Sequence, residues 1–213
     1  MSDRFDELRA EYRGRGLEGE LPEQPLDLLD AWLTDAADAE LRLSNAMALA
    51  TVSDGQPSAR MVLLKNIDER GRLWFFTSYE SAKGVQLEAN PAAALLFYWE
   101  PLHRQVRICG SVERLSAAES DAYFATRPRP SNLAAMTSAQ SRVIDGGRDE
   151  LERAYQSTVE RWQGRELERP ASWGGYGLAP ASFEFWQGKE DRLHHRVHYR
   201  RDGYRWRRDW LYP

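Results

Sequence analysis

The chain has 213 residues, of which 42% are hydrophobic and 29% are charged, and its formal net charge at pH 7 is -4. This composition is too apolar for a disordered chain, and the acidic balance argues against a dedicated nucleic-acid-binding protein. A single cysteine, Cys109, excludes an internal disulfide and a thiolate metal cluster within one chain.

The first part of the chain is predicted to be helical. Residues 4–12 and 26–41 carry apolar residues at helical spacing, which predicts an N-terminal helical segment over about residues 1–42. Residues 1–6 lack the apolar centre of a signal peptide, and no stretch approaches the roughly 20 apolar residues of a membrane helix. We therefore expect a cytoplasmic protein without a membrane partner.

The rest of the chain alternates mainly with the period of strands. The pattern predicts strands over 46–53, 58–67, 72–78, 92–100, 104–116, 182–186 and 193–200, with turns at 54–55, 69–71 and 202–203. Helices are expected over 81–88, 116–126 and 148–163, the second opened by the Ser116/Glu119 capping box and ended by the prolines of 127–130. This content favours a closed or split barrel, mainly β with flanking helices, in a single domain over 1–213.

The sequence contains no common cofactor-binding or catalytic motif in its required context. Residues 14–19 fit the glycine pattern of a dinucleotide-binding turn, but no apolar strand precedes them and a proline-containing linker follows. The sequence has no P-loop, HExxH, paired CxxC or nucleophile elbow. We therefore expect neither a Rossmann site nor a metal site.

Two groups of polar residues suggest anion binding. Arg60 and Lys65 bracket an apolar strand, and because they are five residues apart they face opposite sides unless a bulge intervenes. Tyr123 and Arg127 share a helix face, and Pro128 turns the chain so that Ser131 can join them in a phosphate pocket. Solvated strand ends and a coincidence on a polar surface are the simpler alternatives.

The C-terminal part is locally cationic. Residues 189–208 hold eight Lys or Arg against three Asp or Glu, and strand alternation would place Arg192, His194 and Arg196 on one face. Such a row calls for an anionic or electron-rich ligand. The alternative, an RNA-binding strand, needs a wider basic surface than this acidic chain offers.

Taken together, the motifs resemble the pyridoxine/pyridoxamine 5'-phosphate oxidase family from about residue 8 to residue 213. The resemblance depends on "LRAEY" (8–12), "QPSARMVLLK" (56–65), "FFTSYESAKGVQL" (75–87), "RQV" (104–106), "YFATRPRPS" (123–131), "AQS" (139–141), "SWGGY" (172–176) and "EFWQGKEDRLHHR" (184–196). In this order the motifs are highly specific, although each alone is weak.

The resemblance implies a split-barrel FMN-binding fold that works as a homodimer with shared FMN sites. It assigns FMN contacts in one subunit to Arg60, Met61, Val62, Leu63, Leu64, Lys65, Phe76, Thr77, Lys83 and Gln105, and in the other to Gln140, Ser141, Trp186 and Arg196. It assigns the substrate phosphate to Lys65, Tyr123, Arg127 and Ser131, the substrate ring to Arg192 and His194 as catalytic residues, and a covering segment to Arg9 and Tyr12.

The implied activity is oxidation of pyridoxamine or pyridoxine 5'-phosphate to pyridoxal 5'-phosphate, with oxygen as acceptor and hydrogen peroxide as product. One alternative is a same-fold oxidase of another cyclic compound, such as a phenazine precursor, which the four phosphate-site residues disfavour. The other is a non-catalytic flavin or nucleic-acid-binding module, which the Arg192/His194 pair disfavours.

The chain departs from many relatives at Ala82 and Trp210, where arginine is usual, and at Leu43-Ser44, where an acidic residue and proline are usual.

Overall fold

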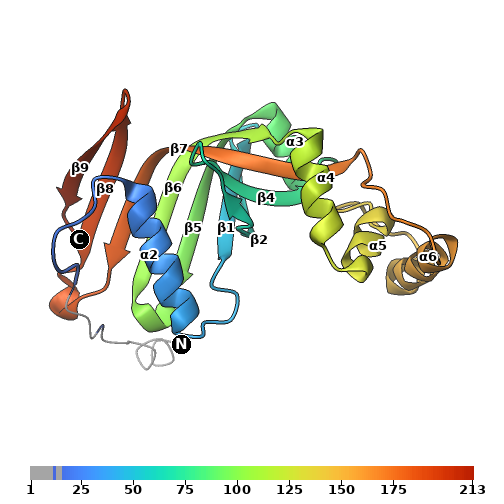
Figure 1. The fold of residues 1–213 in the computed structure, drawn as a ribbon, viewed down its shortest axis with the longest axis horizontal. Coiled ribbons are helices and arrows are strands. Elements are labelled where there is room, and N and C mark those ends of the chain that lie inside the picture. The colour runs from blue at the N-terminus through green and yellow to red at the C-terminus, as the bar shows by residue number, and fades with distance from the viewer. Residues whose placement is uncertain (1–11, 13–15) are drawn as a thin grey trace. The chain divides into compact units, whose positions relative to one another are not determined.

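The computed structural model describes residue 12 and residues 16–213 (Figure 1). The helix expected over 4–12, apart from Tyr12, and the candidate residue Arg9 lie outside the described residues. The described helices are α2 (Pro25–Asp38), α3 (Ala82–Ala89), α4 (Ala117–Thr126), α5 (Arg129–Thr137) and α6 (Gly147–Arg161). None of them is long and apolar enough to cross a membrane.

Nine strands of the described chain form one open sheet. They are β1 (Ala46–Ser53), β2 (Gln56–Leu63), β3 (Asn66–Ile67), β4 (Leu73–Ser78), β5 (Ala92–Trp99), β6 (Arg104–Arg114), β7 (Trp173–Gln187), β8 (His195–Asp202) and β9 (Arg205–Leu211). The order is β2-β1-β5-β6-β7-β4-β3, with β8 paired to β7 and β9 paired to β8. The expectation of a mainly β fold with flanking helices is confirmed, and the sheet is open rather than closed.

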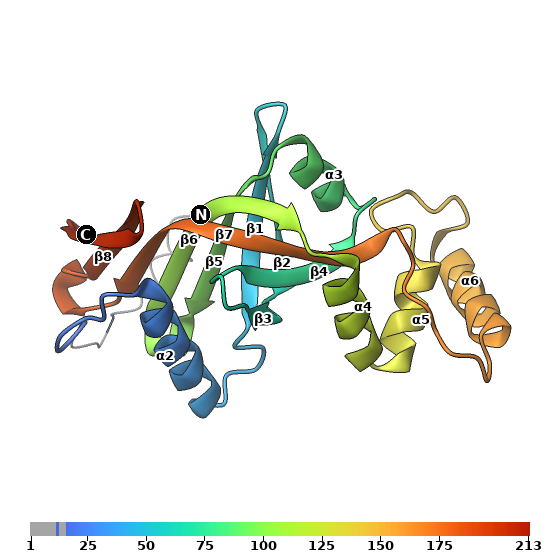
Figure 2. The same cartoon turned by 45° about the horizontal axis from the view of Figure 1, so that its top comes forward.

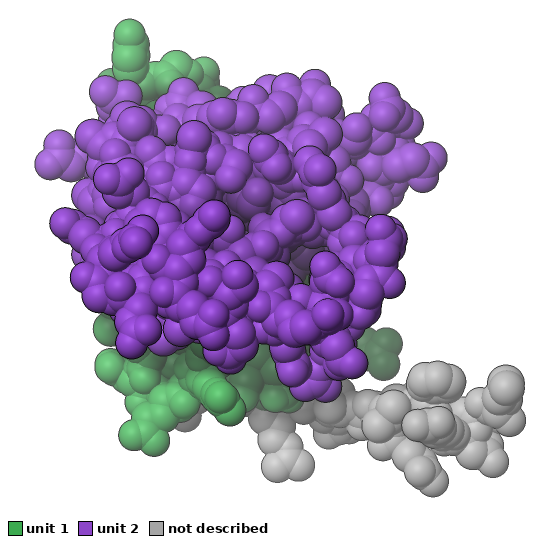
Figure 3. All heavy atoms as spheres, turned by 90° about the vertical axis from the view of Figure 1, so that its right-hand side faces the viewer, with its two compact units in different colours: residues 1–48, 94–109, 180–213 green, residues 49–93, 110–179 purple. Residues whose placement is uncertain are grey.

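The chain divides into two compact units, each containing parts of the long strands (Figure 3). Unit 1 comprises 1–48, 94–109 and 180–213, and unit 2 comprises 49–93 and 110–179.

Unit 1 has an aromatic core. The apolar stripe of α2 is buried as its spacing predicts, and the Trp32 ring meets the Phe185 ring edge-on with 5.3 Å between centroids. Strands β7 and β8 pair antiparallel, and the fully buried Phe185 lies opposite Val197 in the register. The Tyr199 hydroxyl donates to the Pro22 carbonyl at 2.8 Å, so the chain before α2 is tied to β8.

Unit 2 centres on β4 and the first half of β7. Strand β4 alternates buried and half-buried residues, and Phe75 stacks on Tyr176 of the antiparallel β7 at 5.7 Å. At Gly175 a Cβ atom would lie 2.7 Å from the Phe76 ring and 2.4 Å from Leu115, so only glycine lets these side chains approach the strand.

The predicted start of α4 is confirmed, whereas the prediction missed α5. In the capping box of α4, Ser116 Oγ accepts from the Glu119 amide at 3.2 Å, and Glu119 Oε2 accepts from the Ser116 amide at 2.7 Å. The prolines that end α4 also begin α5, an unpredicted helix that lies beside α6 (Figure 2). Proline suits a first helical turn because its missing N–H has no partner there.

The predicted strand 182–186 was too short for β7, and the predicted strand 193–200 began and ended two residues before β8. Strand β7 begins at Trp173, where three glycines hide the strand pattern, and β9 was not predicted as a strand. Strand β8 begins only at His195, after the 3-10 turn η2 (Glu190–Arg192), in which Asp191 and Arg192 have φ values of 58° and 59°.

Candidate active site

Unit 2 contains a cavity of about 620 Å³. This volume suits a small-molecule or cofactor site. Eleven residues that the sequence singled out line it: Met61, Val62, Leu63, Lys65, Phe76, Thr77, Lys83, Tyr123, Arg127, Ser131 and Gln140. The remaining lining residues, which the sequence did not single out, are Ser78, Pro128, Ala134, Ala135, Ser138 and Trp173.

Arg127 is the most distinctive cation of this cavity. It is the C-cap residue of α4, where the backbone leaves the helix with ψ of 147°, and its Nη2 donates to the Ser131 carbonyl at 3.2 Å. Its Nη1 is buried and has no hydrogen-bond partner in the part of the chain that the structure describes. Burial lowers the pKa of this guanidinium. A buried donor without an acceptor beside a cavity is the arrangement expected of an anion site.

Three stacked aromatic rings form a flat wall beside Arg127. The Phe76 and Tyr123 rings stack with 3.8 Å between centroids, and Trp173 lies 5.5 Å from Phe76 at an interplanar angle of 16°. The Arg127 guanidinium carbon lies 4.4 Å from the centre of the Trp173 ring. Trp173 was missed, although an aromatic residue directly before two glycines was a usable signal.

Lys83 supplies a second buried cation. It lies in the first turn of α3 with 8% of its surface exposed, and its Nζ donates to Thr77 Oγ1 at 3.2 Å. Its pKa is lowered by burial and, less strongly, by the charge of Arg60. Thr77 Oγ1 in turn donates to Gln140 Oε1 at 3.0 Å. Within the described residues Lys83 has no carboxylate partner, so its charge is free to meet an anion.

Arg60 does not line the cavity. Its guanidinium donates to the Leu49 carbonyl, Thr51 Oγ1, Ser58 Oγ and Gln86 Oε1 at 2.7–3.2 Å. The parity argument for Arg60 and Lys65 does not apply, because β2 ends at Leu63 and residues 64–65, before β3, are not in a strand. Lys65 reaches the cavity, whereas Arg60 is held by neutral oxygens.

Unit 1 holds a separate aromatic cluster. The Tyr12 ring meets the rings of His194, Trp186 and His103 edge-on, with centroid distances of 5.0, 5.3 and 5.2 Å. Nδ1 of His194 accepts from the Lys189 amide at 3.2 Å, which leaves the ring proton on Nε2 in the neutral form. Burial, and then the charge of Arg192, lowers the pKa of His194.

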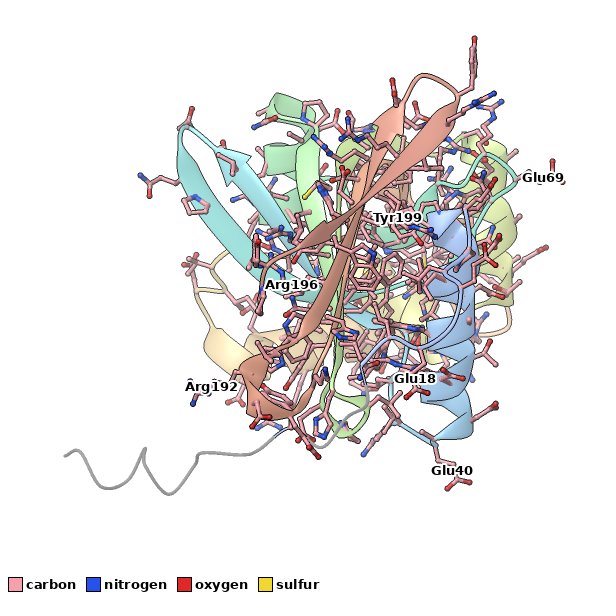
Figure 4. All side chains as sticks on the ribbon, turned by 90° about the vertical axis from the view of Figure 1, so that its left-hand side faces the viewer. Glu18, Glu40, Glu69, Arg192, Arg196 and Tyr199 are labelled. Carbon is pink, nitrogen blue, oxygen red and sulfur yellow. The ribbon has the colours of Figure 1, made fainter. Side chains whose placement is uncertain are left out.

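The predicted row of Arg192, His194 and Arg196 on one strand face is wrong, because β8 does not extend back to residues 192–194. Arg192 is exposed in η2 and points outward, whereas Arg196 lies on β8 (Figure 4). Arg196 binds the buried Glu184 through Nε and Nη2 at 3.0 and 2.8 Å, and Arg107 binds the same carboxylate. Glu184 therefore faces two guanidinium groups.

Three further candidates, Gln105, Leu64 and Ser141, are not among the residues that line the cavity. Gln105 is half-buried in β6 and Leu64 is buried after β2, whereas Ser141 is exposed with φ of 74°. Among the described residues, no group of three or more His, Cys, Asp or Glu side chains could hold a metal ion.

Comparison with known proteins identifies the fold and the family. Residues 33–164 match a family described as pyridoxamine 5'-phosphate oxidase, and residues 173–213 match the pyridoxine 5'-phosphate oxidase C-terminal dimerisation region. Proteins named pyridoxine/pyridoxamine 5'-phosphate oxidase are 52% identical over 212 residues in Thermosynechococcus vestitus, covering 99% of both chains, and 50% identical over 209 residues in Rubrobacter xylanophilus, covering 97% of this chain and 95% of that one.

Two solved structures share the architecture. PhzG from Burkholderia lata, in complex with tetrahydrophenazine-1-carboxylic acid, has a TM-score of 0.85 and 35% identity over 91% of this chain and 95% of its own. A pyridoxamine 5'-phosphate oxidase-related, FMN-binding protein from Nostoc punctiforme has a TM-score of 0.72 and 18% identity over 89% and 98%. The open sheet and its flanking helices are thus those of the split-barrel class. Within this class, the chain belongs to the pyridoxamine 5'-phosphate oxidase family.

Proposed function

We propose that the protein oxidises pyridoxamine or pyridoxine 5'-phosphate to pyridoxal 5'-phosphate, with FMN as cofactor, oxygen as acceptor and hydrogen peroxide as product. Full-length relatives of about 50% identity that carry this enzyme name support the activity, and the predicted oxidoreductase class and FMN cofactor are confirmed. The observation that carries the choice of substrate is the buried Nη1 of Arg127 in the cavity, which has no hydrogen-bond partner among the described residues.

The cavity residues fit two phosphate groups. Lys83, with Thr77 and Gln140 in one hydrogen-bonded chain, is a fitting partner for the FMN phosphate, because Lys83 is buried and unpaired with any described acid. Lys65, Tyr123, Arg127 and Ser131 make the substrate-phosphate anchor. Since Arg127 and Lys83 are both desolvated, an anion gains more from each of them than it would from a solvated cation.

FMN, when bound, supplies the two-electron redox chemistry. The chain's own residues hold the substrate by its phosphate and fix the position of the reacting carbon. His194 keeps its proton on Nε2, since its Nδ1 accepts from the Lys189 amide, and it can therefore donate a hydrogen bond to a ring substituent. The positive charge of Arg192 favours this neutral form of His194.

A second copy of the chain would complete the site. Residues 173–213 match the family's dimerisation region, and Trp186, Arg192, His194 and Arg196 all fall within it. We place these four in the partner's contribution to the shared FMN site. The same assignment for Gln140 and Ser141 follows the resemblance, although Gln140 bonds Thr77 of its own chain.

We further propose that both units act as one domain and that the enzyme is cytoplasmic.

One alternative substrate class has specific support. The PhzG structure, at 35% identity, holds a tetrahydrophenazine carboxylic acid, which has no phosphate group. A phosphate-free substrate would leave the buried Arg127 Nη1 without its strongest type of acceptor.

The deciding experiment compares phosphorylated and dephosphorylated substrates. Purified protein loaded with FMN is given pyridoxamine 5'-phosphate, pyridoxine 5'-phosphate, pyridoxamine, or tetrahydrophenazine-1-carboxylic acid under oxygen, while aldehyde product and peroxide are followed. The proposal predicts oxidation of the phosphorylated compounds with equal yields of aldehyde and peroxide. Faster turnover of the phenazine compound, or a protein that binds no FMN, would reject it.

A further inference from the structure

The segment before α2 is anchored to the C-terminal hairpin of unit 1. We call residues 16–22 the N-terminal strap. Arg208 Nη1 donates to the Leu21 carbonyl at 2.5 Å, and the Tyr199 hydroxyl donates to the Pro22 carbonyl at 2.8 Å. Leu21 is 8% exposed. These contacts fix the far end of the strap on β8 and β9.

His195 holds the near end of the strap. Its Nδ1 accepts a hydrogen bond from the Leu17 amide at 3.0 Å, and its ring meets the Trp210 ring edge-on at 5.7 Å. The ring also fits against Gly16, where a Cβ atom would lie 2.5 Å from Nδ1 and 2.6 Å from Cε1. Gly16 has φ of 87°, a conformation that glycine adopts without strain.

Two adjacent histidines thus contact two parts of the same N-terminal chain. His194 contacts the Tyr12 ring, whereas His195 binds the backbone at Leu17. Tyr12 also fits closely against Gly188, where a Cβ atom would lie 2.9 Å from Tyr12 Cδ1. Since Tyr12 is only five residues before Leu17, the anchor at Leu17 limits how far Tyr12 can move from His194.

We propose that His195 is a positioning residue that holds Tyr12 against His194 and Trp186 by anchoring the N-terminal strap through Leu17. Trp210 supports the His195 ring, which gives a role to one of the chain's departures from the usual family sequence. The consequence for catalysis rests on the proposed function, in which His194 contacts the substrate, and on the resemblance, which assigns Tyr12 to a segment that covers the site. His195 itself touches neither the unit 2 cavity lining nor the His194 ring cluster through any described contact.

The first test measures the anchor directly, without using activity. Hydrogen exchange of the Leu17 amide is followed by mass spectrometry in the FMN-loaded protein and in His195→Ala. Loss of one hydrogen bond predicts exchange about three- to tenfold faster in the variant. His195→Asn, whose side-chain oxygen can accept in place of Nδ1, is expected to restore slow exchange. Unchanged exchange in His195→Ala would overturn the proposal.

A pair of glycine variants separates the His195 contact from backbone strain. Gly16 and Gly19 both have positive φ, of 87° and 78°. A Cβ at Gly16 would meet His195, whereas no atom of a described residue lies within 4 Å of a Cβ at Gly19. Gly16→Ala is expected to behave as His195→Ala, and Gly19→Ala as the unaltered protein. The same exchange rate in both glycine variants would contradict a specific role for His195.

The second test is kinetic. His195→Ala and Gly16→Ala are expected to raise KM for pyridoxamine 5'-phosphate about three- to tenfold and to change kcat less than about twofold, with His195→Asn close to the unaltered enzyme. Faster Leu17 exchange with an unchanged KM would overturn the positioning role. An unaltered protein without oxidase activity would instead reject the proposed function, while the exchange measurement would still decide the anchor.

Discussion

The Arg127 guanidinium stacks over the Trp173 ring, with 4.4 Å between its central carbon and the ring centre, while its Nη1 remains buried and unpartnered among the described residues. The stacking fixes the plane of the guanidinium through a cation–π contact. It thereby presents an orientated donor to the cavity rather than a mobile charge.

Arg127→Ala is expected to raise KM for the phosphorylated substrate by about tenfold to a hundredfold, because a charge-assisted hydrogen bond to phosphate is lost. FMN affinity should change little. Steady-state kinetics and flavin titration measure the two effects. Arg129→Ala is the matched control, because Arg129 is exposed and its guanidinium, in the part of the chain that the structure describes, bonds only the carbonyls of Trp162 and Arg165. Equal losses of substrate and FMN binding in Arg127→Ala would contradict the division of the site.

Lys83→Met is expected to weaken FMN binding by about tenfold to a hundredfold while leaving the FMN-free protein at least as stable as before. The lysine charge is desolvated and has no acid partner within residues 16–213, so its removal relieves a cost in the free protein. The lowered pKa also predicts that FMN affinity falls as the pH rises through the pKa of Lys83, since the neutral amine no longer attracts phosphate. Fluorescence titration of FMN and thermal unfolding of the free protein check both effects, and a destabilised variant with unchanged FMN affinity would refute them.

His194→Asn is expected to lower kcat by at least about tenfold with FMN still bound, because asparagine lacks the Nε2 donor that the proposed function directs at the substrate ring. The pKa of His194 lies below its ordinary value of 6.5 through burial and then through the Arg192 charge. Arg192→Gln should therefore move the acid limb of the kcat profile to higher pH. For the same reason, the contribution of His194 to stability is lost as the pH falls below about 6.5, where the unfolded chain takes up the proton first. An acid limb that stays in place in Arg192→Gln would contradict this coupling.

Leu43→Asn is expected to raise the free energy of unfolding by about 0.5–1 kcal/mol. Leu43 is 61% exposed and has φ of 59°, a left-handed conformation that asparagine tolerates better than leucine. Denaturant unfolding measures the gain. Val143→Asn is the control, because Val143 is 90% exposed and its φ is not positive, so this substitution should bring no gain. A loss of stability in Leu43→Asn would show that its exposed side chain makes a contribution larger than the strain.

Much of the site was predictable from the sequence because its residues fall in short motifs with fixed order. In the structure, residues 61–63 and Lys65 of the motif 56–65 line the same cavity of unit 2 as Tyr123, Arg127 and Ser131. The helix cap at Ser116 was equally clear, since capping is a local interaction between residues three apart.

The sequence could not show features that depend on contacts between distant residues. Trp173 joins the cavity wall only because β7 pairs with β4 and brings it next to Phe76. The prediction that residues 192–196 form one strand face was wrong because Asp191 and Arg192 adopt left-handed conformations. The local sequence gave no sign of these conformations. The hydrogen bond from Leu17 to His195 joins residues 178 positions apart, so neither residue signals the other in the sequence.

The central claim is that Arg127 of one chain and His194 of its partner act on the same substrate. Mixed dimers of Arg127→Ala and His194→Asn, formed by unfolding and refolding the two variants together with FMN, test it most directly. Random pairing makes half of the dimers mixed, and each mixed dimer has one intact site. At a substrate concentration well below KM, where both separate variants are impaired, activity is therefore expected to recover to about a quarter of that of the unaltered enzyme. Activity no higher than that of the separately refolded variants would place both residues in the site of a single chain and contradict the claim.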